Sequence, residues 1–442
     1  MELPNSNRRR FIIFVNVCRW LLATVMMLSG FLKAVDPVGA MYKLQEYALA
    51  FSFVDVSDDV LLIVAVLQAA VEFLLGLYLF VGIYRKVIPF MTILAMLLFT
   101  PLSFYLWVSG AVSDCGCFGE SIIMSNGATF LKNLFLLFFA IVTFVGRASF
   151  VNSLSLKIRW LLVLFSWVYI FGLQMFTLMH LPLVDFGPYA MDNNIRSMVK
   201  VVPAEYEYLS LYKKGSEELI LPVDSVPGSE WEFVQTFSEV VREGVEPEIS
   251  NFEIIDWEGD FEITEVLLAD TGYVCIVSIE DVESASLSHI DRINDLYEHC
   301  SDNSINFCAV SSSEVDEVQL WAKRTGAEYP VNWADATMLR SLIRSNPGLV
   351  LLKDGVIVGK WAAADIPGVE ELENSPTLMP DSVHSSYDGL RSLAFWVIVL
   401  SGVLFLFTLL NLFLGIGRKK NSKAIGDNTT EKVVDDETSD LN

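Results

Sequence analysis

The sequence has little positive charge. It contains 30 Lys and Arg against 54 Asp and Glu, which gives a net charge of −24 over 442 residues. Proteins that bind nucleic acid need a basic footprint, so this balance argues against nucleic acid as a partner. The sequence also has no internal repeat.

Hydrophobic residues, by contrast, make up 53% of the chain and gather in long runs. A helix needs about 20 mostly apolar residues to cross a bilayer. No A-x-A-like cleavage site follows the first run, so we interpret it as a membrane helix rather than a signal peptide. The sequence therefore predicts the lipid bilayer as a partner and six spans, at 11–30, 60–83, 87–108, 128–145, 160–179 and 393–414.

Basic residues near the ends of the runs predict the orientation, because Lys and Arg favour the cytoplasmic side. With six spans, all of these segments fall on one side of the membrane. They contain Arg8 to Arg10, Arg85, Lys86, Arg147, Lys157, Arg159, Arg418, Lys419, Lys420 and Lys423. We therefore expect a multi-pass protein of a bacterial inner membrane with both termini in the cytoplasm. The loop 113–121 and the region from about 180 to 390 then face the periplasm.

Two opposite charges interrupt the first two runs, and a charge inside a membrane needs a partner or a function. At 1.5 Å per residue, Arg19 and Glu72 each lie roughly 12 Å from the cytoplasmic side of the hydrocarbon core. The sequence therefore predicts an Arg19–Glu72 ion pair, which Gln68 joins from the same helix face. The pair either fixes the helix register, which we favour, or forms part of a proton or quinone site.

The loop between the third and fourth runs holds two cysteines one residue apart, in the stretch DCGCFG. Asp114 precedes them. A bridge between Cys115 and Cys117 would close a small strained ring, and strained disulfides are readily reduced. Gly116 permits the unusual backbone of such a ring, and Lys132 favours a thiolate. Thiol–disulfide exchange, a static clip and a metal site all remain open, although two sulfurs fall short of a closed zinc site.

Several of these pieces resemble the DoxX-like membrane proteins, and among them the MauE type. The resemblance covers about residues 10–150. It rests on SGFLKAVDP (29–37), Glu72 with Gly76, DCGCFG (114–119), and Lys132 with Asn133. It implies a four-helix bundle. It also implies a role near periplasmic disulfide chemistry, because MauE is associated with the maturation of a disulfide-rich dehydrogenase.

The region 250–375 alternates strand-like and helix-like stretches, which indicates an α/β layer structure. Two continuous apolar runs predict buried parallel strands, and a Lys-Asp-Gly turn predicts a hairpin. The expected strands are 272–279, 305–311 and the hairpin 346–361, and the expected helices are 284–300 and 313–325.

This order resembles a thioredoxin-like domain of the peroxiredoxin and TlpA type, with Pro347 at the family's cis-proline position. Where that family has W-C-x-x-C, the sequence has DVESA, with Val282 and Ala285 at the approximate cysteine positions. A site without a thiol cannot exchange disulfides. The resemblance therefore implies a degenerate thioredoxin fold that serves for binding or docking.

The expected fold is thus a membrane α-helical bundle, DoxX/MauE-like in its first four helices with two further spans, plus an extracytoplasmic α/β thioredoxin-like domain. The expected segments are the bundle (8–150), the fifth helix (158–180), a small β-rich adaptor (181–249), the thioredoxin-like domain lacking CxxC (250–375), a tether (376–391), the sixth helix (392–416) and a disordered cytoplasmic tail (417–442).

For function, we favour a redox-associated membrane module that passes oxidising or reducing equivalents through Cys115 and Cys117 to a periplasmic or membrane protein. Such a module would be a thiol–disulfide oxidoreductase. A non-enzymatic envelope scaffold is the first alternative, and it treats the CGC loop as a clip. The second alternative is a quinone-coupled subunit, which requires a quinone pocket near Glu72.

Overall fold

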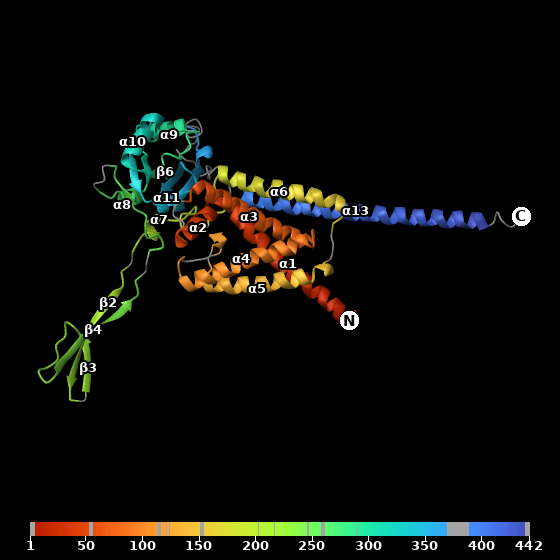
Figure 1. Ribbon diagram of the computed structural model, residues 1–442. Coiled ribbons are helices and arrows are strands. Elements are labelled where there is room, and N and C mark those ends of the chain that lie inside the picture. Colours follow the sequence, from red (N-terminus) through yellow and green to blue (C-terminus); the bar gives the residue numbers. More distant parts are fainter. Residues whose placement is uncertain are drawn as a thin grey trace. The chain divides into compact units, whose positions relative to one another are not determined.

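The computed structural model of the chain divides into two compact units, each described here by itself (Figure 1). The membrane unit comprises residues 1–186 and 387–442, and the second unit comprises residues 187–386. The structure describes residues 5–52, 56–112, 116–120, 122, 124–150, 154–201, 203–215, 217–244, 247–257, 261–288, 290–368 and 389–437.

The membrane unit contains the long apolar helices that the sequence predicts. Among the described residues, six helices are long and apolar enough to cross a membrane, which confirms a multi-pass membrane protein. They are α1 (Asn5–Val35), α3 (Asp58–Val81), α4 (Val87–Ser109), α5 (Asn126–Val145), α6 (Leu156–Met179) and α13 (Gly389–Glu437). The first four form a bundle, and α13 packs on α6, where the Tyr169 hydroxyl donates to the Trp396 carbonyl at 3.0 Å (Figure 1).

Two glycines set the register between α1 and α3. A Cβ atom at Gly30 would lie 2.3 Å from the backbone nitrogen of Phe73, and one at Gly76 would lie 2.4 Å from that of Met27. Both distances are far below van der Waals contact, so the two backbones touch only because these positions lack side chains. Close approach through small residues is the usual way in which membrane helices pack. Sliding α1 along α3 would separate these contacts.

A further helix, α2 (Pro37–Ala50), follows α1 and was not expected from the sequence. The Asp36 side chain accepts a hydrogen bond from the backbone nitrogen of Gly39 at 2.8 Å, and Pro37 occupies the first helical position. Both are standard ways to begin a helix. The end of the motif SGFLKAVDP, Asp36-Pro37, therefore carries the start signal of this helix. A short strand, β1 (Cys117–Glu120), and a 3₁₀ turn, η1 (Arg147–Ser149), complete this part of the chain.

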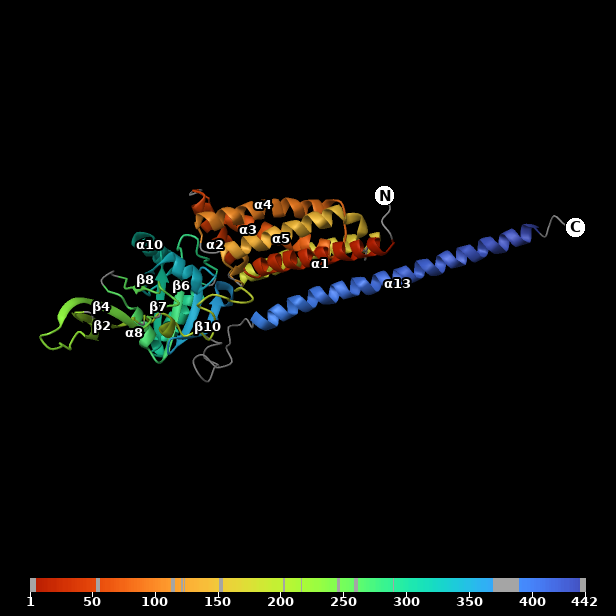
Figure 2. The same ribbon diagram turned by 90° about the horizontal axis from the view of Figure 1, so that it is seen from below.

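The second unit contains a six-stranded mixed sheet in the order β10-β9-β6-β7-β8-β5. Strands β6, β7 and β8 are parallel, whereas β9 and β10 run antiparallel to their neighbours. Figure 2 labels β6, β7, β8 and β10 of this sheet. Helices α9 and α10 connect the parallel strands. The bounds are β5 (Ile254–Ile255), α8 (Thr264–Ala269), β6 (Tyr273–Ile279), α9 (Ile290–Asp302), β7 (Asn306–Ser311), α10 (Val315–Thr325), β8 (Val331–Ala334), α11 (Ala336–Leu342), β9 (Gly348–Lys353), β10 (Val356–Ala362) and η2 (Ala363–Asp365).

This β-α-β unit followed by a β-hairpin confirms the thioredoxin-like fold. Pro347 precedes β9 in a cis peptide bond, as the resemblance implied. The hairpin turns through Asp354 and Gly355, which both have positive φ, at 51° and 73°. Two positive φ values suit the twist of antiparallel strands, which explains the Asp-Gly pair at this turn. Helix α9 begins later than expected, at Ile290 instead of residue 284.

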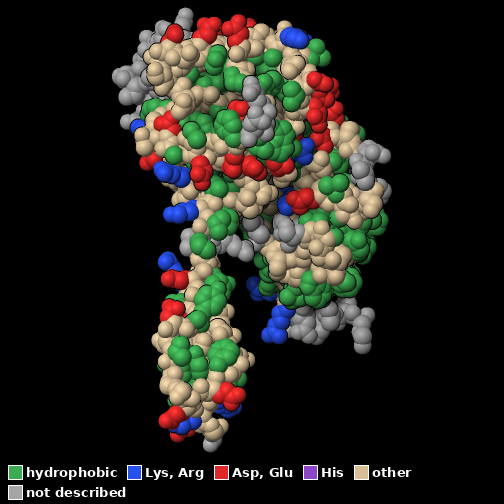
Figure 3. Space-filling view, turned by 90° about the vertical axis from the view of Figure 1, so that its left-hand side faces the viewer, with side chains coloured by type: hydrophobic (Ala, Val, Ile, Leu, Met, Phe, Trp, Pro, Cys, Tyr) green, Lys and Arg blue, Asp and Glu red, His purple; other side chains and the backbone are tan. Residues whose placement is uncertain are grey.

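A separate three-stranded sheet, in the order β3-β2-β4, lies within the stretch 181–249 that we expected to be β-rich. It is built from β2 (Glu205–Lys214), β3 (Glu217–Pro222) and β4 (Glu232–Arg242), and α7 (Ile195–Met198) precedes it. Hydrophobic side chains lie on its surface among charged ones (Figure 3). Tyr208 and Phe233, for example, are 60% and 55% exposed.

The C-terminal end differs from the expectation of a disordered tail over 417–442. Helix α13 continues past the apolar segment to Glu437. The stretch 418–437 holds four Lys but only one Ala and two Glu, and its Asn, Asp, Thr and Gly are weak helix formers, so local propensity does not explain this extension. Most of the tether expected at 376–391 lies outside the described residues.

Candidate functional site

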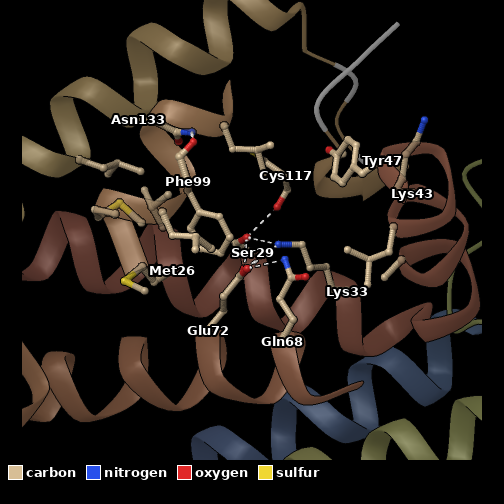
Figure 4. A pocket seen from close by; sticks show the side chains of 18 of the residues that line it. Met26, Ser29, Lys33, Lys43, Tyr47, Gln68, Glu72, Phe99, Cys117 and Asn133 are labelled. Atoms are coloured by element: carbon tan, nitrogen blue, oxygen red, sulfur yellow. Dashed lines mark hydrogen bonds and ion pairs between the residues drawn. The ribbon is translucent and has the colours of Figure 1, made fainter. Parts of the chain in front are cut away.

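A cavity of about 300 Å³ opens inside the membrane bundle beside the CGC loop (Figure 4). Side chains from α1, α2, α3, α4 and α5 line it, and the loop contributes Gly116 and Cys117. Most of the lining is hydrophobic. The polar members are Ser29, Lys33, Lys43, Tyr47, Gln68, Glu72, Lys132 and Asn133. The cavity therefore joins the loop to a group of polar side chains within the bundle.

A buried ion pair between α1 and α3 forms the polar centre of this cavity. The Lys33 Nζ atom lies 2.8 Å from Oε1 and 2.7 Å from Oε2 of Glu72. Gln68 Nε2 donates to Oε1 of the same carboxylate at 3.0 Å. Lys33 and Glu72 are only 7% and 5% exposed. Because both charges are removed from solvent, each depends on the other.

The predicted Arg19–Glu72 ion pair is therefore wrong, and Lys33 is the partner of Glu72. Arg19 lies ten residues before Ser29, which contacts Glu72, so it is about 15 Å away along α1. Its guanidinium lies 4.8 Å from the ring centroid of Phe150. The prediction failed because it measured the depth of Arg19 and Glu72 in the membrane from the ends of the two apolar runs. The close packing at Gly30 and Gly76 decides their actual register. The predicted role of Gln68 as a partner of Glu72 is correct.

The CGC loop meets the ion pair through one hydroxyl group. The Ser29 Oγ atom lies 2.6 Å from the backbone carbonyl oxygen of Cys117 and 2.7 Å from Oε2 of Glu72 (Figure 4). Lys33 Nζ donates to the same hydroxyl at 3.3 Å. A serine hydroxyl has a single proton, so it cannot donate fully to both acceptors at once. The Ser29 hydroxyl thus links the backbone of the loop to the Glu72 carboxylate.

Gly116 adopts the conformation that its residue type allows. Its φ is +54°, in the left-handed region that other residues seldom adopt. A Cβ atom there would also lie 2.9 Å from Cγ of Lys43. Gly116 therefore permits both the turn of the loop and its contact with α2. Cys115 and Asp114 lie outside the described residues.

Lys132 does not contact Cys117 through any described hydrogen bond. Its ammonium lies 4.3 Å from the ring centroid of Phe118, a cation–π contact between α5 and the loop. Asn133, the next residue of α5, donates to Ser103 Oγ at 3.1 Å and ties α5 to α4. The Lys132 side chain nevertheless lines the cavity, so its positive charge lies near the loop.

In the thioredoxin-like domain, the residues that replace the usual cysteines are packed into the core. Val282 and Ala285 are 2% and 7% exposed. The Asn346 side chain donates to the backbone oxygen of Asp281 at 2.8 Å and so holds the turn where a reactive pair would lie. Pro347 follows Asn346 and so adjoins this turn. The turn has Val282 and Ala285 at the approximate positions of the usual cysteines.

Sequence reasoning placed Ser29 and Lys33 only in the SGFLKAVDP resemblance, without a role in the site, and it missed Lys43. Ser29 and Lys33 are four residues apart and share a helix face, as do Gln68 and Glu72. A search of each intramembrane charge for every possible partner would have included Lys33. Among the described residues, no group of three His, Cys, Asp or Glu gathers as a metal site would require.

Comparison with known proteins supports the interpretation of the membrane unit as similar to the MauE type. Residues 12–146 match the family described as methylamine utilisation protein MauE. This confirms the resemblance for the first four membrane helices. No curated protein matches the chain.

A solution structure of a candidate protein disulfide isomerase from Bacteroides thetaiotaomicron is also similar. It shares 20% identity and covers 28% of this chain and 80% of that protein, with a TM-score of 0.23. The strand order described above, rather than this likeness, identifies the thioredoxin-like fold.

Proposed function

We propose that the membrane unit is a thiol–disulfide exchange module of the cell envelope, with Cys115 and Cys117 as the reacting pair. The observation that carries this proposal is the contact of Ser29 with both the Cys117 carbonyl and the Glu72 carboxylate. It connects a dicysteine loop to a buried acid–base pair and to a cavity. The thioredoxin-like domain, whose reactive positions lack thiols, acts as the docking part.

The chemistry requires a way to remove protons as well as electrons. When two thiols form a disulfide, they release two protons and two electrons, and the reverse reaction takes both up. The electrons pass to the disulfide of a protein partner, which becomes a dithiol. Glu72 is the carboxylate that the described hydrogen bonds place next to the loop, through Ser29. We therefore assign proton exchange to Glu72 and stabilisation of its charge to Lys33.

A purely structural role for the ion pair is a weaker account. The register of α1 against α3 already follows from the close packing at Gly30 and Gly76. A buried ion pair usually contributes little net stability over well-packed apolar residues of similar size, because desolvation opposes the attraction. An ion pair next to a cavity and a dicysteine loop is better explained by a function there.

The test is to trap the exchange intermediate in intact cells. In a Cys117→Ser variant, Cys115 can attack a partner but cannot be released, so a mixed disulfide accumulates. We expect an adduct of higher mass on non-reducing gels that disappears after reduction. A Cys115→Ser/Cys117→Ser double variant should give none. Cys18→Ser, at a buried position in α1, is the matched control. Absence of the adduct would favour the scaffold interpretation.

The cavity supports a second candidate function, oxidation of the loop thiols by a quinone. Ligand cavities are mostly apolar with a few directed polar groups, and they begin at about 300 Å³. This cavity meets both conditions, and Lys33 and Gln68 are donors that suit the carbonyl oxygens of a quinone. The balanced reaction converts two thiols and one quinone into a disulfide and a quinol.

The two candidate functions differ in the electron acceptor, which is a protein disulfide in one and a quinone in the other. If a quinone is the acceptor, purified protein should reduce a short-chain quinone at the expense of the loop thiols, and Glu72→Gln should slow this step. Glu218→Gln is a matched control, because Glu218 pairs with Lys213 through exposed side chains in the three-stranded sheet of the other unit. Absence of quinone reduction by the wild-type protein would count against the quinone, and unchanged reduction in Glu72→Gln would count against the role of Glu72.

The proposal also needs the loop in the oxidising compartment. The distribution of basic residues supports a periplasmic loop, a periplasmic thioredoxin-like domain and cytoplasmic termini in an inner membrane. After mild reduction, a membrane-impermeant thiol reagent should label the loop cysteines in intact cells. Labelling only after lysis would overturn this placement and the function with it.

A further inference from the structure

Two other cysteines lie against each other in the core of the thioredoxin-like domain. Cys275 belongs to the central strand β6 and Cys300 to α9. Their Sγ atoms are 3.6 Å apart. The two residues are 0% and 1% exposed. Neither occupies the position at which a thioredoxin-type domain has its reactive pair.

The third cysteine of the domain, Cys308, lies on the other face of the sheet. In the parallel ladder between β6 and β7, Cys275 pairs with Phe307, and Cys308 pairs with Ile276. Successive residues of a strand point to opposite faces. Phe307 packs against Tyr297 of α9, with ring centroids 5.2 Å apart. The face covered by α9 therefore brings together only Cys275 and Cys300 among the described cysteines.

We propose that Cys275 and Cys300 form a buried disulfide in the mature protein, which ties α9 to the central strand of the sheet. A disulfide needs an S–S distance of about 2.05 Å, so the two sulfurs have to approach by roughly 1.5 Å. The inference rests on the periplasmic placement of the domain, because disulfides persist in oxidising compartments. It does not depend on the chemistry of the CGC loop.

The oxidant is a protein disulfide of the thiol-oxidising class. One cysteine thiolate attacks this disulfide and forms a mixed disulfide. The other cysteine then attacks the mixed disulfide, which forms the Cys275–Cys300 bond and releases the oxidant as a dithiol. Two protons leave the two thiols and two electrons pass to the oxidant. Because both sulfurs are buried in the native fold, this exchange takes place during folding, before α9 covers the sheet.

Burial also makes the bond a structural one. A reductant cannot reach the sulfurs while the domain is folded, so the disulfide resists reduction until the domain opens. The bond closes a chain separation of 25 residues. Crosslinks of this kind stabilise a fold mainly by restricting the unfolded chain.

Peptide mapping of the full-length protein from membranes tests the proposal directly. The protein is denatured and alkylated without reductant and then digested. We expect a linked peptide pair that contains Cys275 and Cys300 and has a mass two hydrogens below the sum of the free peptides. Cys308 should carry the alkyl group. Alkylation of both Cys275 and Cys300 would overturn the proposal.

Thermal unfolding in detergent supplies a second measurement. The protein is first unfolded, reduced and refolded. This treatment should lower the midpoint temperature of thermal unfolding of the thioredoxin-like domain in the wild type and in the Cys308→Ala variant. A Cys275→Ala/Cys300→Ala variant should show no further shift. An equal shift in this variant would contradict the proposal.

The proposed exchange at the CGC loop and the proposed Cys275–Cys300 disulfide can be disproved independently of each other. Cys117→Ser abolishes the proposed exchange but should leave the Cys275–Cys300 link unchanged in the peptide map. If Cys275 and Cys300 are both found alkylated in the peptide map, the purified protein is next oxidised with diamide. This step shows whether the two sulfurs are too far apart to bond or whether the compartment is not oxidising. A link that forms only with diamide points to a domain on the reducing side, which would also overturn the periplasmic loop.

Discussion

The membrane unit and the thioredoxin-like domain each hold a pair of cysteines, at 115 and 117 in the sequence of one and at 275 and 300 in the core of the other. In the membrane unit, Cys117 is partly exposed and lines a cavity next to a buried ion pair. In the domain, Cys275 and Cys300 are enclosed in a hydrophobic core. The fold that is known for thiol chemistry thus has only buried cysteines, whereas the helical bundle presents a cysteine at a cavity. Function follows the surroundings of a residue more closely than the fold that carries it.

The sharpest test of this contrast is thiol reactivity. Burial raises the pKa of the Cys308 thiol to about 12. An ordinary exposed thiol has a pKa of about 8.5, so Cys308 has roughly three-thousandfold less thiolate near neutral pH. Because the pKa is raised, this fraction should grow with pH and remain small up to pH 11. We expect mass spectrometry of the native protein, after mild reduction, to show alkylation of the loop cysteines well before Cys308.

The control for this experiment is the denatured chain, in which all thiols should react alike. Rapid alkylation of Cys308 in the native protein at pH 8 would show that the domain core is open. The contrast between the two regions would then fail.

The next largest effect should come from leaving one buried charge without a partner. Glu72→Gln or Lys33→Met should each destabilise the membrane unit by about 3–5 kcal/mol, because the remaining charge stays buried. The Lys33→Met/Glu72→Gln double variant should recover much of this loss. Unfolding in detergent micelles measures the changes.

Glu46→Gln is the comparison for a surface charge, since its side chain is 44% exposed and its pair with Lys43 is worth at most about 1 kcal/mol. If Glu72→Gln proved as mild as Glu46→Gln, water would have to reach the ion pair.

A smaller effect is expected from the glycine contacts that place Glu72 next to Ser29. Gly76→Ala forces a methyl group to within 2.4 Å of the Met27 nitrogen, so α1 and α3 must separate. Overpacking of this kind costs about 1–3 kcal/mol. Gly402→Ala in α13, where nothing lies within 4 Å, should be close to neutral. Equal midpoints of thermal unfolding for the two variants would show that the register does not depend on this contact.

The smallest effect should be local to the CGC loop. Gly116→Ala must place an alanine at a φ of +54°, which costs about 1–2 kcal/mol, and must also displace Lys43. Gly119→Ala meets the same backbone cost at φ +63° but has no neighbour within 4 Å. Limited proteolysis should therefore cut the loop faster in Gly116→Ala than in Gly119→Ala. The reverse order would exclude the Lys43 contact as a restraint on the loop.

Much of the architecture could be predicted because it depends on neighbouring residues. Six apolar runs predict six helices, since a helix closes its hydrogen bonds within its own segment and needs no distant partner. The buried strands β6 and β7 and the Asp-Gly turn were likewise evident locally. In the site, Gln68 next to Glu72 was correctly expected from the spacing of four residues on one helix. Helix α2 was missed although its Asp-Pro start was visible.

The sequence by itself determined the membrane spans, the thioredoxin-like order of strands and the lack of thiols at the usual positions of that fold. Only the tertiary structure decided that Lys33 rather than Arg19 neutralises Glu72, that Ser29 reaches the CGC loop, and that Cys275 faces Cys300. The physical reason is that hydropathy and turn chemistry act between consecutive residues. The partners across two helices, or across a helix and a sheet, depend on contacts such as those of Gly30 and Gly76, which join residues more than 40 positions apart.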